Sequence, residues 1–326
     1  MPHILHKQAL ELISQAEHIL LLTDERIDGD TIGSTLGMFH VLQEMGKYVE
    51  VFSPKEMLSI LEFIPGTEVI QRDPSIFDQA SIDLVIIFDC SDGEYFKGYL
   101  PKLKPSIPII VFDHHISNPG YGTLNFIEPN AASTADVVWR FIKDLKLPMN
   151  KHAAQAILTG ITTDTNTFST SNTTAACLEA AHELARYGAK IQEIVRETMM
   201  NKSLSTLKLW GLAFERLHQN ERFSAVTTAI TENDIADLAV DEMETKALSN
   251  FLNAMVEGTD VVLVLRETDD GGVKASFRSQ SRDVAAQAEE FGGGGHVRAA
   301  GFKITEARLV EKEGIWQIVK KGGEVL

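Results

Sequence analysis

Three short apolar stretches of this chain are each followed by side chains that can bind a metal ion or move a proton. They are His18–Thr23, Ile82–Phe88 and Ile107–Phe112. A buried β-strand requires the apolar residues but not the ionisable residues that come after them. In open α/β sheets, ligands bind in the crevice outside the carboxyl ends of the strands. The ionisable residues at these three ends are Asp24, Asp28, Asp30, Asp89, Asp113, His114 and His115.

A further acid, Asp164, lies in a threonine-rich turn after a helical segment. Taken singly, Asp30 could cap a helix and Asp164 could form an Asx-turn. Carboxylates gathered in one crevice, however, repel one another unless cations lie among them. Carboxylate and imidazole ligands without a thiolate favour Mn²⁺, Mg²⁺ or Fe²⁺, and five or six of them suit two ions about 3.5–4 Å apart. We therefore predict a two-metal site that activates water for attack on a phosphoryl group, built from Asp24, Asp28, Asp30, Asp89, His114 and Asp164.

The elements that must position these residues alternate between strands and helices. This alternation predicts an α/β fold with a parallel sheet and helices on both faces in residues 1–190. Residues 191–220 are expected to form a helical linker, and residues 221–326 a smaller mixed α/β domain. In that second domain we expect a helix over 242–256, a hairpin turn at Asp269–Gly272 and a helix over 283–291.

Composition limits the classes of substrate and location. The 326-residue chain carries 30 Lys and Arg against 46 Asp and Glu, a net charge of −16, which would repel a long polyanion. We therefore expect a small substrate and no long nucleic acid. The chain has no apolar run long enough for a membrane span and no secretory signal pattern. It has two cysteines and no Cys-x-x-Cys, so we expect a cytoplasmic protein without a disulfide framework.

The ordered set of these motifs resembles the DHH phosphoesterase superfamily, which is named for the triplet Asp113-His114-His115. Phe291-Gly-Gly-Gly-Gly-His-Val-Arg-Ala-Ala-Gly301 is similar to the signature of the DHH-associated C-terminal domain. Within the superfamily the layout is similar to bacterial oligoribonucleases that also dephosphorylate 3′-phosphoadenosine 5′-phosphate. The resemblance covers nearly the whole chain.

The resemblance implies two divalent ions, with Mn²⁺ favoured and Mg²⁺ or Co²⁺ as alternatives. It places Asp28 and Asp89 on one ion, and on the other it places Asp30, Asp89, His114 and Asp164, so that Asp89 bridges the two. Two positions depart from the family, which usually has histidine where this chain has Asp24 and proline where it has Ile27. We expect Asp24 to serve as an oxygen ligand, which would shift the preference towards harder ions.

The resemblance also implies the roles of residues outside the ligand set. His115 would lie near the substrate phosphate and supply a proton to the leaving oxygen, with Asp89 also catalytic, and Asp113 would support the site. The far end of the substrate would meet Arg278, Ser279, Gly293, Gly294, Gly295, His296 and Arg298. Independently, consecutive glycines let backbone N–H groups approach a phosphate, and an arginine offers a two-pronged donor.

The expected function is hydrolysis of short oligonucleotides, such as the dinucleotide pApA, or of 3′-phosphoadenosine 5′-phosphate. Three alternatives stay open: a cyclic-dinucleotide phosphodiesterase, an inorganic pyrophosphatase of the same superfamily, and a nucleotide-binding protein weakened by the change at Asp24. Pyrophosphate has no base or ribose, so it gives no reason for the glycine-histidine stretch. The expected partner is short RNA or a small nucleotide, without a membrane, and a homodimer is compatible with the sequence.

Overall fold

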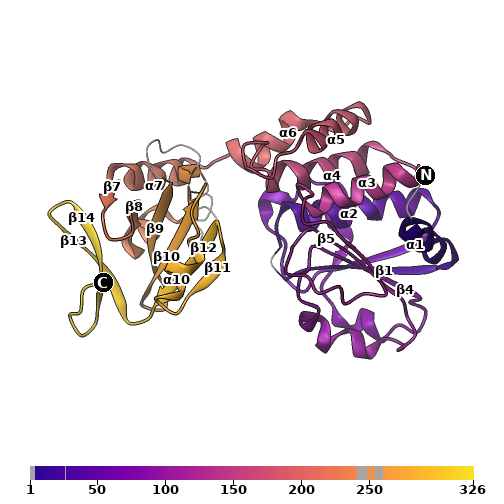
Figure 1. The fold of residues 1–326 in the computed structure, drawn as a ribbon, viewed down its shortest axis with the longest axis horizontal. Coiled ribbons are helices and arrows are strands. Elements are labelled where there is room, and N and C mark those ends of the chain that lie inside the picture. Colours follow the sequence, from indigo (N-terminus) through magenta and orange to yellow (C-terminus); the bar gives the residue numbers. More distant parts are fainter. Residues whose placement is uncertain (1–3, 26, 241–247, 250, 254–259) are drawn as a thin grey trace. The chain divides into compact units, whose positions relative to one another are not determined.

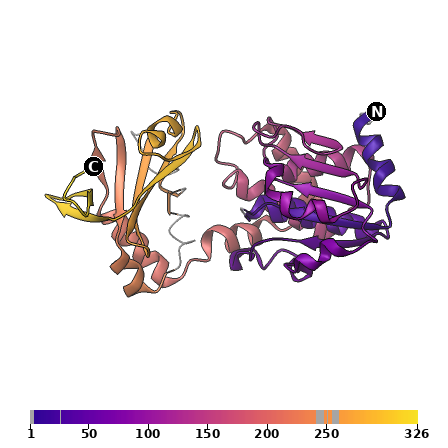
Figure 2. The same cartoon turned by 90° about the horizontal axis from the view of Figure 1, so that it is seen from below.

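The computed structural model describes residues 4–25, 27–240, 248–249, 251–253 and 260–326. The chain forms two compact units, Met1–Asn201 and Lys202–Leu326. Each has a sheet and a hydrophobic core of its own (Figures 1 and 2).

The first unit is built on a six-stranded parallel sheet with the order β3-β2-β1-β4-β5-β6. Its strands are β1 (His18–Thr23), β2 (Tyr48–Phe52), β3 (Ile70–Gln71), β4 (Leu84–Phe88), β5 (Ile109–Asp113) and β6 (Leu124–Ile127). The central strands β1 and β4 are buried along their whole length, as their unbroken apolar sequences predict. The predicted parallel α/β fold is confirmed.

The two faces of this sheet are covered differently. Alternate residues such as Leu21 and Ile86 face a core shared with α-helices, while Leu20 and Val85 face the other side. The helices on the first face are α1 (Ile4–Gln15), α2 (Gly29–Glu44), α3 (Thr134–Leu145) and α4 (Lys151–Asp164), with α5 (Ala175–Arg186) and α6 (Ile191–Val195) outside α4 (Figure 1). The other face is covered by the short 3₁₀ helices η3 (Pro74–Asp78), η4 (Gly93–Gly98) and η5 (Leu100–Lys102).

Helices α2 and α4 approach each other closely because glycines line their contact. A Cβ atom on Gly33 would lie 2.5 Å from the carbonyl oxygen of Ala156, and one on Gly160 would lie 2.9 Å from Asp30 Oδ1. No larger side chain fits at either position without displacing backbone or the acid. The close crossing therefore brings the C-terminal end of α4, with Asp164, beside the N-terminal turn of α2.

The second unit has a mixed six-stranded sheet with the order β11-β12-β10-β9-β8-β7, in which only β8 and β9 pair in parallel. Its strands are β7 (His218–Asn220), β8 (Ala225–Ile230), β9 (Val261–Thr268), β10 (Gly272–Ser279), β11 (Gly294–His296) and β12 (Ala299–Ile304). A hairpin of β13 (Ala307–Lys312) and β14 (Ile315–Lys320) follows. The smaller mixed domain predicted from the sequence is present.

Helices cover this second sheet, and one of them lies in the region expected to be a linker. The helices are α7 (Leu204–Glu215), α8 (Glu232–Leu238) and α10 (Ala285–Glu289), and residues 196–200 continue α6 as a π-helical turn. Helix α7 buries Leu209 and Ala213 against β8 and β9, so it belongs to the second unit. Most of the helix expected over 242–256 lies outside the described residues.

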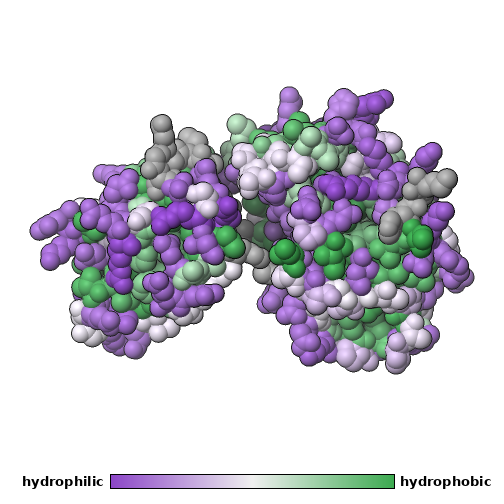
Figure 3. All heavy atoms as spheres, in the orientation of Figure 1, coloured by the Kyte–Doolittle hydropathy of each residue, from purple (hydrophilic) through white to green (hydrophobic). Residues whose placement is uncertain are grey.

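No helix among the described residues is long and apolar enough to cross a bilayer. On the face drawn in Figure 3, each unit shows many hydrophilic side chains with apolar side chains interspersed among them.

Candidate metal centre

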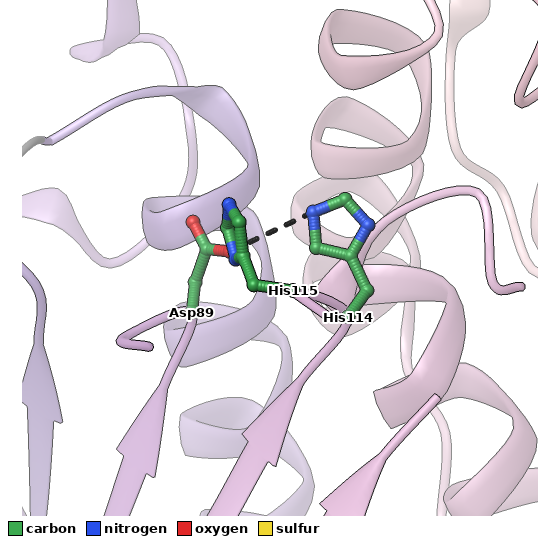
Figure 4. A group of neighbouring side chains, drawn as sticks. All are labelled: Asp89, His114 and His115. Carbon is green, nitrogen blue, oxygen red and sulfur yellow. Dashed lines mark ion pairs between the residues drawn. The ribbon is translucent and has the colours of Figure 1, made fainter. Parts of the chain in front are cut away.

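The ionisable residues singled out in the first unit gather where the strand order of the parallel sheet reverses. The order runs outward from β1 to β3 on one side and from β4 to β6 on the other. The carboxyl ends of two such neighbouring strands leave a crevice that no crossover helix fills. Asp89 follows β4, and His114 and His115 follow β5 (Figure 4).

His114 is the residue that the carboxylates surround. Its Nε2 atom lies 4.0 Å from Asp30 Oδ2, 4.0 Å from Asp89 Oδ1 and 3.8 Å from Asp164 Oδ2. Ligand atoms of an octahedral ion with bonds near 2.1 Å lie about 3.0–4.2 Å from one another. Among the described residues, two groups each offer three ligand atoms within 4.8 Å of one another, namely Asp30, His114 and Asp164, and Asp89, His114 and His115. The donors present thus fit divalent metal ions.

The electrostatics of this cluster favour a cation. Burial raises the pKa values of Asp30, Asp89 and Asp164 well above the usual range, and the negative charges of neighbouring acids raise them further. For Asp30 these neighbours are Asp164 and Asp28. Without a positive charge among them, the acids therefore bind protons more tightly than ordinary carboxyl groups do. A divalent cation would replace those protons and remove the repulsion.

Asp30 is fixed by the first turn of α3. Its Oδ2 accepts the backbone N–H of Thr134 at 2.7 Å, and its Oδ1 accepts the N–H of Ala135 at 2.8 Å. Helix α3 begins after Ser133, whose side chain caps it by accepting the N–H of Asp136. The unpaired N–H groups of a helix N-terminus favour a negative charge. A residue about a hundred positions away in sequence thus receives its orientation from this helix.

Asp113 orients His115 and does not join either ligand group. It is fully buried. Its Oδ1 accepts a hydrogen bond from Nδ1 of His115 at 2.7 Å, and its Oδ2 accepts one from the side-chain amide of Asn118 at 2.7 Å. Burial alone would raise the pKa of Asp113, but the hydrogen bonds from His115 and Asn118 hold it below its usual value. An ionised Asp113 makes Nδ1 of His115 a donor and so sets the tautomer of the ring.

Asp28 and Asp24, the other expected ligands, are placed differently. Asp28 is exposed and caps α2, where its Oδ1 accepts the N–H groups of Asp30 and Thr31. Asp24 is buried and lies 3.8 Å from the sulfur of Cys90, and this acid contributes to a raised pKa of about 12 for the Cys90 thiol, whose first cause is burial. Neither acid belongs to the two ligand groups found among the described residues. Their roles as ligands stay predictions.

Four polar residues of the site did not stand out in the sequence. Thr31 and Thr134 both hydrogen-bond to Asp89, Asn118 hydrogen-bonds to Asp113, and Asn172 hydrogen-bonds to Asp164. Thr31 and Thr134 stand in the first turns of two helices that begin at the site, and that position is the signal that could have identified them.

In the second unit, Arg278 lies in β10 opposite Ala299 of β12, and Ala299 is in turn opposite His296 of β11. Residues directly opposite one another in a sheet share a face, so this register places positions 278 and 296 on one face. Arg278 is partly buried, its Nη1 donates to the carbonyl of Phe277 at 2.8 Å, and burial lowers the pKa of its guanidinium.

The other expected substrate residues lie around this row. Ser279, next to Arg278 in β10, projects to the opposite face and is buried, with its Oγ accepting the N–H groups of Ser281 and Arg282. Ser279 therefore caps the turn after β10 instead of lying beside Arg278. Gly294 pairs with Gly301 and Gly295 with Ala300, while Gly293 precedes the strand and Arg298 is exposed.

A Cβ atom at Gly295, which has φ +144°, would lie 2.6 Å from the carbonyl oxygen of Ala299. The close pairing of β11 with β12 thus requires a glycine at this position.

The fold and the site define a DHH-type phosphoesterase architecture, and comparison with known families agrees. Residues 18–161 match the DHH family, N-terminal domain, and residues 227–320 match the DHHA1 domain. The chain belongs to the DHH family.

Its curated relatives include enzymes of known name. The chain is 32% identical over 292 residues to the bifunctional oligoribonuclease and PAP phosphatase NrnA of Thermus thermophilus, covering 88% of this chain and 84% of the relative. It is 25% identical to the protein of the same name from Bacillus subtilis, covering 91% and 92%. A cyclic-di-AMP phosphodiesterase PdeA of Listeria monocytogenes is 26% identical over 94% of this chain but only 48% of its own length.

Solved structures show the same fold. An exopolyphosphatase-related protein from Bacteroides fragilis superposes with a TM-score of 0.84 at 22% identity, covering 93% of this chain and 92% of that one. RecJ from Thermus thermophilus in complex with Mn²⁺ has a TM-score of 0.52 at 16% identity, covering 94% of this chain and 53% of that one.

Proposed function

We propose that this chain is a divalent-metal-dependent phosphoesterase that hydrolyses short oligonucleotides and 3′-phosphoadenosine 5′-phosphate. The observation that carries the proposal is the convergence of Asp30, Asp89 and Asp164 on His114 at the strand-order reversal. The activities for which the relatives matching both units are named supply the substrate class.

The acids and His114 would hold two divalent ions, with Mn²⁺ as the favoured metal. The ions, when bound, supply Lewis acidity towards the phosphoryl group and lower the pKa of a water between them. Oxygen and nitrogen donors without a thiolate in the ligand groups support a hard or borderline ion. Asp24 and Asp28 are proposed as further ligands. The support for Asp28 is its negative charge, which raises the pKa values of Asp30, Asp89 and Asp164.

His115 is proposed as the proton donor to the leaving oxygen. Its Nδ1 is held by Asp113 at 2.7 Å and lies 3.6 Å from Asp89 Oδ1. An imidazole held in a fixed orientation beside the reacting phosphate can serve as a general acid. Asp113 would then act on the reaction only by orienting this ring.

The second unit is proposed to bind the non-reacting end of the nucleotide. Arg278 would contact a phosphate, and the backbone N–H groups at Gly293, Gly294 and Gly295, with His296 and Arg298, would complete this site. The acidic net charge of −16 supports short substrates over long ones, because few cations are present to neutralise a long phosphate backbone.

One panel assay tests this function. Purified protein with Mn²⁺ is compared, at equal concentrations, on pApA, 3′-phosphoadenosine 5′-phosphate, cyclic di-AMP, pyrophosphate and a long single strand. We expect turnover of the first two and little turnover of the long strand. Absence of turnover on every phosphodiester or phosphomonoester with Mn²⁺, Mg²⁺ and Co²⁺ would refute the proposal.

A cyclic-dinucleotide phosphodiesterase is the second candidate, because PdeA matches across 94% of this chain. In the same panel, faster hydrolysis of cyclic di-AMP than of pApA would favour it. Faster hydrolysis of pApA would leave the oligonucleotide activity as the main function.

A further inference from the structure

Both carboxylate oxygens of Asp89 are hydrogen-bonded to threonine hydroxyls that come from two different helices. Thr31 Oγ1 in α2 donates to Asp89 Oδ2 at 2.6 Å, and Thr134 Oγ1 in α3 donates to Asp89 Oδ1 at 2.9 Å. Both threonines are fully buried. A buried hydroxyl needs a hydrogen-bond partner, and for both threonines that partner is Asp89.

Asp89 needs such support because of its backbone. It has φ 58°, in the left-handed region that non-glycine residues rarely adopt. Its N–H is tied to the carbonyl of Phe112 at 2.9 Å, which fixes the main chain at the end of β4. The direction of the carboxylate then depends on what its oxygens contact. Each carboxylate oxygen has two lone pairs, so one threonine on each oxygen leaves one lone pair on each for a cation.

Each threonine also contacts a second acid of the site. Thr31 Oγ1 lies 3.2 Å from Asp28 Oδ1, and the backbone N–H of Thr134 donates to Asp30 Oδ2 at 2.7 Å. Thr31 thus joins Asp28 to Asp89, and Thr134 joins Asp30 to Asp89. These are the acid pairs that the resemblance to the DHH superfamily implies for the first and the second ion.

We propose that Thr31 and Thr134 are positioning residues that hold Asp89 ready to be shared between two ions, with each threonine serving one of the two sites. The inference rests on the proposed two-metal function. It predicts that removing one hydroxyl weakens binding of one ion more than that of the other. Replacing threonine by valine deletes the hydroxyl at nearly constant volume, and in Thr134→Val the backbone contact to Asp30 remains.

The test compares Thr31→Val and Thr134→Val with the parent protein. Mn²⁺ binding to the metal-free protein is measured by calorimetry and by electron paramagnetic resonance, without any nucleotide. The parent is expected to bind two ions with the spectrum of a coupled pair. Each valine variant is expected to bind one of the ions about 10–100-fold more weakly, the usual effect of removing a hydrogen bond to a ligand. At low Mn²⁺ its spectrum becomes that of an isolated ion.

Thr35→Val is the matched control. Thr35 is also fully buried in α2, one turn after Thr31, but its Oγ1 donates only to a helix carbonyl, that of Thr31, at 2.7 Å. This variant should keep both ions. Thr31→Ser and Thr134→Ser restore the hydroxyl and should restore the second ion, which shows that a loss in the valine variants does not come from misfolding.

Two coupled ions bound by Thr31→Val and Thr134→Val with an affinity within twofold of the parent would overturn the inference. So would equal losses in the valine and serine variants. Because no nucleotide is present, either result is separate from the substrate assay. A protein that binds two ions but hydrolyses nothing in the panel would refute the proposed function and leave this inference standing.

Discussion

At the scale of single residues, the site depends most on Asp89, because this acid lies next to both histidines of the site. It lies 4.0 Å from His114 and 3.6 Å from His115, and both its oxygens are hydrogen-bonded to threonines. Its pKa is raised by burial and by the charges of Asp30 and Asp28. Ionising a buried acid beside other acids is unfavourable, and a bound cation would offset this cost.

Replacing Asp89 with Ala should lower kcat/KM on pApA by several orders of magnitude, because both ions would lose a ligand. Asp89→Asn keeps the volume but not the charge, and its amide nitrogen cannot accept one of the two threonine hydroxyls, so we expect a similar loss. The assay is initial-rate hydrolysis in saturating Mn²⁺, with thermal melting as the control for folding. Near-normal turnover by either variant would contradict the bridging role.

Asp24 is one of two positions at which the resemblance to the DHH superfamily implies a departure from the family's usual residue. It is buried beside Cys90 and lies outside both described ligand groups. Asp24→His restores the nitrogen donor that the family usually has, and we expect the variant to keep or raise Mn²⁺-dependent activity. Activity is compared in Mn²⁺ and Mg²⁺. A folded but inactive variant would show that the environment of Asp24 is adapted to the carboxylate and not to a metal.

At the scale of elements, the close crossing of α2 and α4 sets the distance between Asp30 and Asp164. A methyl group at Gly160 would lie 2.5 Å from Ala135 Cβ and 2.9 Å from Asp30 Oδ1. Gly160→Ala should therefore lower the free energy of unfolding by about 1–3 kcal/mol and weaken Mn²⁺ binding, since relief of the clash displaces Asp30. Denaturant unfolding and calorimetry measure the two effects.

Gly211→Ala provides the control, because Gly211 in α7 has open space around the added methyl group. A better helix former there should leave stability unchanged or raise it by up to about 1 kcal/mol, with no effect on Mn²⁺ binding. If Gly160→Ala behaves like Gly211→Ala, the close approach of α2 and α4 does not determine the site.

The sequence predicts the strands that consist of apolar residues. It does not predict a strand whose extended conformation depends on pairing with a neighbouring strand. The bounds of β1 agree with the predicted segment His18–Thr23, because an apolar run of this length is buried along its whole length. Strand β11 was not predicted, because Gly294-Gly295-His296 has no strand propensity and is extended only by pairing with β12. The short 3₁₀ helices under the sheet were also missed, since each has too few residues for a periodic pattern.

The candidate site divides in the same way. Asp89 and His114 could be found because an ionisable residue directly after a buried strand is visible in the sequence. Thr31 and Thr134 could not be assigned, because their hydroxyls reach Asp89 across 58 and 45 residues of sequence. Such contacts follow from the packing of α2 and α3 on the sheet, which no local pattern specifies.

At the scale of the whole molecule, the buried acids couple metal binding to stability. In the metal-free protein the pKa values of Asp30, Asp89 and Asp164 are raised well above the usual range by burial and mutual repulsion. The folded state therefore holds these protons more tightly than the unfolded state does. Their stabilising contribution is complete below the ordinary carboxyl pKa of about 4 and is lost as pH rises through the raised values.

With a chelator present, the melting temperature of the parent should fall more steeply with rising pH above about 4 than that of Asp164→Asn, which lacks one of these carboxyls. Titrating groups that do not interact with Asp164 are common to both proteins and cancel in the difference. Loss of the Asp164 charge also lowers the pKa of Asp30, which makes the fall in the variant shallower still. Mn²⁺ takes the place of the protons, so it should flatten the fall in the parent and raise its melting temperature most at high pH. Differential scanning calorimetry over the pH series measures both effects. Parallel curves for the two proteins, with and without Mn²⁺, would show that Asp164 does not hold a proton that a cation replaces.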